Sequence, residues 1–385
     1  TLIRDGAKAA ANAAGLVLVD DEGLVAENAG LTEWPVPMLG RFDPAFLEVP
    51  QEVIQLTARV NQKYFVCHDA NGKLANAFVC TANIVANDGG AAIVAGNEKV
   101  LAARLSDAKF FWEQDLKVPL AERHTKLSNI VFHEQLGTVA QRHERFAQLV
   151  DDFQGELPES LDSAREAAAL LKSDLVTDMV GEFPELQGLM GGYYAEKEAL
   201  GSSVSAAIRD HYKPVGQSDA LPDDGAATLT ALIDKIDALV GFFGVGMKPT
   251  GSKDPFALRR AALGVIRLIT ENRLRLNLKR LFNAAAQLYR NQNVSVANSE
   301  QELLDFFADR LKVQQREAGV RHDLIDAVFA LGGEDDLVRL LSRVKALQGF
   351  VTTDEGVNLL AGYKRAANIL KQSGDAEILQ QVQHD

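Results

Sequence analysis

Cysteine is nearly absent from this sequence. Cys67 and Cys80 are the only two, thirteen residues apart, with no CxxC pair and no histidine at zinc-ligand spacing. A disulfide scaffold and a metal ribbon are therefore excluded. We expect both thiols to be reduced core residues of a cytoplasmic protein.

Long apolar runs are also missing. No run approaches the ~20 residues that a helix needs to cross a bilayer, so we expect no membrane partner. The N-terminal residues lack a basic stretch followed by an apolar core, which argues against a signal peptide. The chain begins with Thr1 rather than Met, and we therefore expect a processed or shortened chain.

Basic residues are fewer than acidic ones. Lysine and arginine number 40 against 53 aspartates and glutamates, which gives a net charge of −13. The whole molecule should not bind nucleic acid non-specifically, and we expect no DNA partner, although a local group of basic residues can still bind RNA. The 385 residues are 47% apolar and 24% charged, which is typical of a folded protein of two or three domains.

The first 115 residues mix strand and helix patterns. Residues 7–14 are Ala-rich and predict a helix, and residues 16–19 predict a short strand. Apolar segments at 63–68 and 77–85 flank Asn71-Gly72, whose preference for positive φ suits a tight hairpin turn. A further helix is expected over 96–112.

From Leu116 onward the apolar residues recur at helical spacing almost throughout, among them Leu127, Val131 and Leu136. The segments Ala164 to Val180 and Leu229 to Phe243 repeat the pattern. We predict an α+β fold with three parts. These are a mixed α/β module at 1–115, a mostly helical domain at 116–290 and a further helical block at 291–385.

The strongest charge feature runs from Lys248 to Arg280. Nine basic residues stand against Asp254 and Glu271, so the stretch carries +7. A Gly-rich loop, 244–253, leads into a helix predicted to begin at Asp254-Pro255, since Asp caps free N–H groups and Pro suits the first helical position. Amides and lysines there suit a phosphate, although the loop is no P-loop. The alternative is a solvated helix face beside a loop packed for structural reasons.

Histidines and aspartates are scattered through residues 116–240, which raises the possibility of an HD-type metal phosphohydrolase. Such a site needs an adjacent His-Asp pair facing a further His and Asp. Asp174 follows a serine instead, and the three His-Asp dipeptides, His68-Asp69, His322-Asp323 and His384-Asp385, lie outside this region. We therefore expect no catalytic residue and no bound metal.

Seven motifs, in order along the chain, match one known family. They are LTEWP at 31–35, QKYF at 62–65, GNEK at 96–99, MVGEF at 179–183 followed by Gln187-Gly188, the segment 234–241, KDPFALRR at 253–260 and KRAANIL at 364–370. From Leu31 to Leu370 the chain resembles the β subunit of bacterial heterotetrameric glycyl-tRNA synthetase.

The resemblance implies an α2β2 assembly. In that family the α subunit carries the class II active site and uses ATP and Mg²⁺, while the β subunit supplies tRNA recognition. The implied partners are thus the α subunit and tRNA(Gly), with no cofactor bound by this chain. The middle region is identified as an HD-like domain with degenerate positions at Asp174, His211 and Asp234. The block at 291–385 then leads into a truncated anticodon-binding domain, which makes this chain a central fragment.

The resemblance also gives the basic residues a candidate role as contacts to the tRNA backbone. The residues are Lys248, Lys253, Arg259, Arg260, Arg267, Lys364 and Arg365. The competing structural explanation is that Asp254 pairs with Arg259 or Arg260 and locks the Gly-rich loop.

Three functions remain open. The first is a non-catalytic, tRNA-binding part of a synthetase, the second is a metal-dependent phosphohydrolase of HD type, and the third is a pure scaffold for the α subunit. We favour the first.

Overall fold

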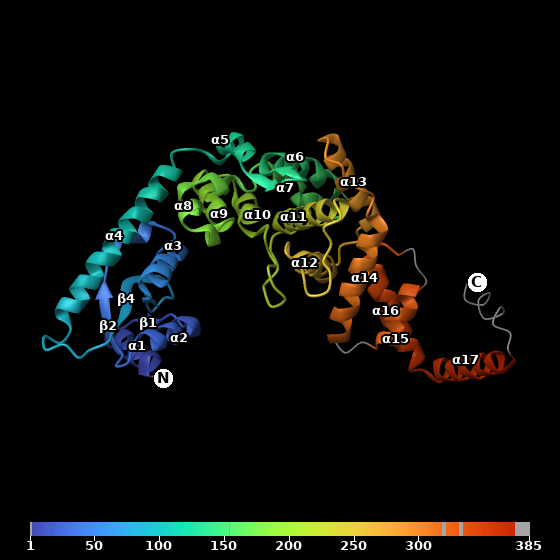
Figure 1. Ribbon diagram of the computed structural model, residues 1–385, viewed down its shortest axis with the longest axis horizontal. Coiled ribbons are helices and arrows are strands. Elements are labelled where there is room, and N and C mark those ends of the chain that lie inside the picture. Colours follow the sequence, from blue (N-terminus) through green and yellow to red (C-terminus); the bar gives the residue numbers. More distant parts are fainter. Residues whose placement is uncertain (1, 154, 318–320, 331–333, 374–385) are drawn as a thin grey trace. The chain divides into compact units, whose positions relative to one another are not determined.

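The chain folds into two compact units, which we describe separately in a computed structural model (Figure 1). The structure describes residues 2–153, 155–317, 321–330 and 334–373. Unit 1 contains Thr1–Ile130 and Leu170–Asp210, and unit 2 contains Val131–Ala169 and His211–Asp385. Each unit is therefore built from two separate stretches of chain.

Unit 1 contains a four-stranded antiparallel sheet in the order β1-β3-β4-β2. The predicted hairpin is confirmed, because β3 and β4 pair across a turn at Gly72, whose φ is 77°. Cys67 and Cys80 lie on these strands, buried and free. The strands are β1 (Val17–Leu18), β2 (Val36–Arg41), β3 (Phe65–His68) and β4 (Leu74–Ala82).

Helices pack on this sheet. Helix α1 (Leu2–Ala13) buries Ile3, Ala7 and Ala11 against it, as expected from the Ala-rich pattern. The 25-residue helix α4 (Ala91–Asp115) runs alongside β2 (Figure 1). The other helices of this part are α2 (Glu22–Leu31) and α3 (Gln51–Leu56).

The rest of unit 1 is a small helical group that follows α4. Helices α9 (Leu189–Lys197) and α10 (Ser202–Asp210) approach very closely. A Cβ on Gly192 would lie 2.6 Å from the Cβ of Arg209, so only glycine fits at this position. The remaining helices of the group are α5 (Leu120–Arg123) and α8 (Asp178–Glu182).

Unit 2 is helical around one central element, α11 (Gly225–Gly244), which is buried along almost its whole length. It packs mainly against α6 (Val139–Leu149), α7 (Leu161–Ala168), α12 (Leu258–Glu271) and α13 (Leu278–Asn291). The predicted segment Leu229 to Phe243 lies within α11. The predicted C-terminal block is also helical, as α14 (Glu300–Glu317), α15 (His322–Ala330), α16 (Leu337–Val351) and α17 (Asp354–Ser373).

Short helical turns join these elements. The 3-10 turns are η1 (Pro44–Glu48), η3 (His124–Asn129), η4 (Val150–Phe153), η5 (Pro158–Ser160), η6 (Ser173–Val176) and η7 (Pro184–Leu186), and η2 (Thr57–Asn61) is a π turn. Within the described ranges, no helix is both long and apolar enough to span a membrane.

Two helical expectations are wrong. Residues 131–138 form a hairpin, β5 (Val131–His133) with β6 (Gly137–Thr138), because Gly137 adopts φ 88° and Thr138 begins a capping box for α6. Ala164 to Val180 is not one helix either. Helix α7 ends at Ala168, and Lys172 then has a left-handed φ of 63°, so Asp174 lies in the short turn η6 and not on an α-helix.

The α+β class predicted from the sequence is confirmed. The three-part division at residues 115 and 290 stays a prediction, since the compact units describe packing alone.

Candidate nucleic-acid interface

The loop before α12 is held in one shape by its own backbone. The N–H of Thr250 donates to the carbonyl of Lys253 at 3.0 Å, and the reverse bond is 2.8 Å. Arg259 Nη2 reaches back to the carbonyl of Gly251 at 2.7 Å. The exposed Lys253 side chain therefore projects from an ordered turn.

The start of α12 differs from the sequence prediction. The helix begins at Leu258, preceded by Ala257 with a left-handed φ of 55°, so Pro255 is not its first residue. Asp254 still caps it from outside, since its carboxylate accepts the N–H groups of Leu258 at 2.8 Å and Arg259 at 2.9 Å. Asp254 thus locks the loop through backbone N–H groups, and no ion pair with Arg259 or Arg260 is found among the described residues.

Most cations of the basic stretch have partners within the protein. Lys248 pairs with Glu302 at 2.5 Å. Arg267 pairs with Glu271 at 2.8 Å and donates to the carbonyl of Asp219 at 2.9 Å. Carboxylates distant in sequence neutralise three more cations, in the pairs Arg275–Asp336, Lys279–Glu300 and Arg280–Asp152.

A smaller set of basic residues stays available to a ligand. Lys253, Arg260 and Arg273 are exposed and make no ion pair or side-chain hydrogen bond with the described residues. Lys364 and Arg365 are also exposed, but they lie on a separate element, α17. Of the seven predicted contact residues, five therefore lie in one loop and helix. Of these five, Lys253 and Arg260 are the two that make no ion pair or side-chain hydrogen bond with the described residues.

An aromatic cluster beside this loop was missed at the sequence level. Phe256 stacks on Phe242 with ring centroids 4.0 Å apart. His133 lies edge-on to both rings, 5.5 Å from Phe256 and 5.3 Å from Phe242. No local pattern could have joined these rings, because His133 is on hairpin β5–β6, far from Phe256 in sequence.

The HD-like positions are divided between the two units. Asp174 is in unit 1, whereas His211 and Asp234 are in unit 2. His211 is fully buried next to Tyr212, and Asp234 faces Arg142 at 3.3 Å. The described residues contain no group of three or more His, Cys, Asp or Glu side chains that could hold a metal ion.

Asp174 instead has a structural contact. Its Oδ2 accepts the N–H groups of Gly188 at 2.5 Å and Gly191 at 3.2 Å, at the start of α9. Its Oδ1 has no hydrogen-bond partner in the described part of the chain. Burial raises the pKa of the Asp174 carboxyl, although the two N–H groups lower it.

Asp174→Asn should therefore increase stability at neutral pH. The folded state keeps this proton at pH values where the unfolded chain has released it, so the carboxyl destabilises the fold as pH rises above about 4. Urea unfolding of wild type and Asp174→Asn between pH 4 and 8 measures this, and the difference between them should grow with pH. A constant difference would show that Asp174 is ionised in the fold.

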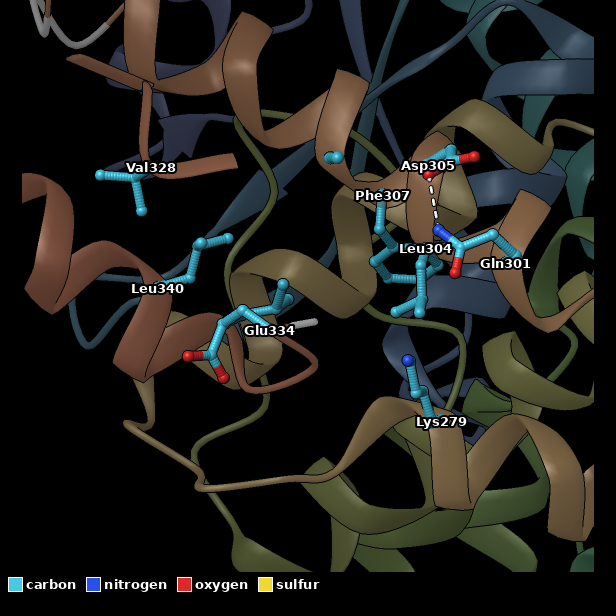
Figure 2. A pocket seen from close by; sticks show the side chains of 10 residues that line it. Lys279, Gln301, Leu304, Asp305, Phe307, Val328, Glu334 and Leu340 are labelled. Atoms are coloured by element: carbon cyan, nitrogen blue, oxygen red, sulfur yellow. Dashed lines mark hydrogen bonds between the residues drawn. The ribbon is translucent and has the colours of Figure 1, made fainter. Parts of the chain in front are cut away.

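One pocket lies between helices of unit 2 and has a volume of about 130 Å³. Its polar groups are already engaged, since Gln301 donates to Asp305 at 2.9 Å (Figure 2) and Glu334 binds Arg339 at 2.7 Å. Both carboxylates that line this pocket therefore have a partner within the protein. The lining residues are Lys279, Gln301, Leu304, Asp305, Phe307, Ala308, Val328, Glu334, Leu337 and Leu340.

Comparisons with known proteins give a consistent result. A family model described as the glycyl-tRNA synthetase beta subunit matches residues 1–330. The chain is 56% identical over 376 residues to the glycine–tRNA ligase beta subunit of Rhodospirillum centenum, covering 96% of this chain and 52% of that protein. It is 55% identical over 373 residues to the one from Phenylobacterium zucineum, covering 96% and 53%. The chain thus spans about half the length of these relatives.

Proposed function

The chain belongs to the glycyl-tRNA synthetase beta subunit family, and from this premise we propose that it binds tRNA(Gly) without catalysing a reaction itself. The ligation of glycine, with its ATP and Mg²⁺, takes place on the α subunit that is its partner. The RNA contact lies on the loop before α12 and on the first turns of that helix.

One observation carries this proposal. In a strongly acidic chain, Lys253 and Arg260 are exposed cations on a fixed loop and helix, and the described residues supply no carboxylate for either. Uncompensated cations on a rigid frame bind phosphates without first breaking an internal pair. Arg259 and Arg267 have a structural role instead, because their guanidinium groups donate hydrogen bonds to the backbone carbonyls of Gly251 and Asp219.

The test is a double charge reversal, Lys253→Glu with Arg260→Glu, in the full-length protein assembled with its α subunit. Each phosphate contact contributes about 0.7–0.9 to the slope of log K against log salt. The double variant should therefore bind tRNA(Gly) at least about tenfold more weakly at low salt, with a slope flatter by about 1.4–1.8. Filter binding over a salt series measures both quantities.

Lys99→Glu with Arg104→Glu is the matched control. Both residues are exposed on α4, in the other unit, and the same change in net charge is made there. The control variant should keep the wild-type slope. If both double variants lose affinity for tRNA(Gly) equally, the effect is one of overall charge. If neither variant loses affinity while assembly with the α subunit is intact, the chain acts as a scaffold.

A further inference from the structure

The cluster formed by His133, Phe242 and Phe256 has the features of a stacking platform for a base. His133 and Phe256 are half-buried, so each ring is partly open to solvent. Phe242 is buried beneath them and fixes Phe256 by stacking at an interplanar angle of 16°. The rings therefore stay in place without a ligand, and little order has to be gained on binding.

His133 also offers a directed hydrogen-bond donor. Its Nδ1 accepts the N–H of Gln135 at 3.2 Å, so the proton of the neutral ring is on Nε2. No residue in the described ranges accepts a hydrogen bond from Nε2. This N–H can reach a phosphate or the edge of a base.

Charge completes the arrangement. Lys253 precedes Phe256 by three residues and Arg260 follows it by four, and both are exposed cations. Glu134 is the acidic residue nearest to His133 in sequence, and it is exposed in the turn of the hairpin. Aromatic rings flanked by cations are the usual means of binding unpaired nucleotides, because only an unpaired base can present its face.

We propose that His133 and Phe256 bind one unpaired nucleotide of the tRNA, with its base on the aromatic rings and its phosphates near Lys253 and Arg260. This inference rests on the proposed function and deepens it. Binding to paired regions of the tRNA would use the cations alone. The unpaired nucleotide is what sets this site apart from a general basic surface.

Two substitutions at position 133 separate stacking from hydrogen bonding. His133→Gln keeps a donor and removes the ring, whereas His133→Phe keeps the ring and removes the donor. For the full-length protein with its α subunit, His133→Gln should weaken tRNA(Gly) binding by about tenfold, near the lower end of what stacking on one aromatic side chain contributes. His133→Phe keeps the stacking and loses one hydrogen bond, so it should weaken binding less than His133→Gln, by about two- to fivefold. A thermal unfolding curve for each variant checks that the fold is intact.

Two further RNAs test whether the effect of His133→Gln depends on an unpaired base and where that base lies in the tRNA. A blunt RNA duplex should bind wild type and His133→Gln equally, because it has no unpaired base. A tRNA transcript that lacks its unpaired 3′ nucleotides locates the bound base. If wild type and His133→Gln bind this shortened transcript with equal affinity, the bound base comes from the 3′ end. If His133→Gln still binds it more weakly than wild type, the base comes from a loop.

Failure of this inference can be told from failure of the proposed function. If the reversal at Lys253 and Arg260 weakens binding while His133→Gln has no effect on tRNA, the unpaired-nucleotide site is wrong and RNA binding stands. The site is equally overturned if His133→Gln weakens the blunt duplex as much as tRNA. If neither variant changes the affinity, both proposals fail.

Discussion

Asp237→Asn is expected to lower the free energy of unfolding of unit 2 by about 3–5 kcal/mol. Asp237 lies on α11 with about 1% of its side chain exposed, and it holds two guanidinium groups. Arg145 Nε approaches its Oδ1 at 2.6 Å, and Arg142 Nε approaches its Oδ2 at 2.9 Å. Tyr289 from α13 donates its hydroxyl to the same carboxylate at 3.1 Å.

The cost is large because the cations cannot escape to water. Burial by itself would lower the pKa of Arg145, yet the attraction of Asp237 raises it, so the group stays charged in the fold. Without this carboxylate, the buried Arg145 has no carboxylate partner among the described residues, and Arg142 keeps only Asp234 at 3.3 Å. Since this cluster joins α6, α11 and α13, its loss should loosen the whole helical core of unit 2.

Asp162→Asn is the control for this prediction. Asp162 pairs with Arg165 on α7, but its side chain is 98% exposed, and such a surface pair contributes at most about 1 kcal/mol. Urea unfolding followed by circular dichroism compares the two variants. Equal and small effects would show that the buried cluster is not the main support of the core.

Asp115→Asn is expected to have the second largest effect, about 3 kcal/mol on unit 1. Asp115 is the last residue of α4 and is buried. Its carboxylate accepts the N–H groups of Asp178 at 3.0 Å and Met179 at 2.9 Å, and the hydroxyl of Tyr194 at 2.9 Å. Arg123 lies 3.4 Å away.

One carboxylate therefore joins α4 to α5, α8 and α9. Burial, followed by the charge of Asp115, raises the pKa of Tyr194, so that phenol is a firm donor at neutral pH. Removing the negative charge leaves Arg123 buried without its counter-ion. We therefore expect lower stability and faster limited proteolysis within the unit 1 segments 116–130 and 170–188. Asp107→Asn, an exposed position on the same helix, should change stability by less than about 0.5 kcal/mol. Indistinguishable proteolysis of the two variants would contradict the prediction.

Features of the fold with local causes could be predicted from the sequence. The hairpin turn at Asn71-Gly72 and the apolar stripe of α12 are both set by residues that lie next to one another. The end of α7 at Ala168 could not be predicted, because the turn η6 that follows is held by contacts of Asp174 with Gly188 and Gly191. Tertiary contacts overrode the helical pattern there.

The same limit applies to the candidate interface. The excess of basic residues between Lys248 and Arg280 is plain in the sequence, but which of them are neutralised depends on Asp152, Glu302 and Asp336, which lie elsewhere in the chain. The contact between His133 and Phe256 likewise depends on a hairpin that the apolar pattern concealed. Charge density located the surface, and only the fold shows which of its residues are accessible.

Lysine footprinting of the full-length protein with its α subunit tests the central claim most directly. Acetylation of Lys253 and Lys99, read by mass spectrometry with and without tRNA(Gly), compares the proposed contact with an exposed lysine on α4. The account predicts that tRNA protects Lys253 strongly and leaves Lys99 unchanged. Equal modification of Lys253 in both samples, at a tRNA concentration that saturates binding, would contradict it.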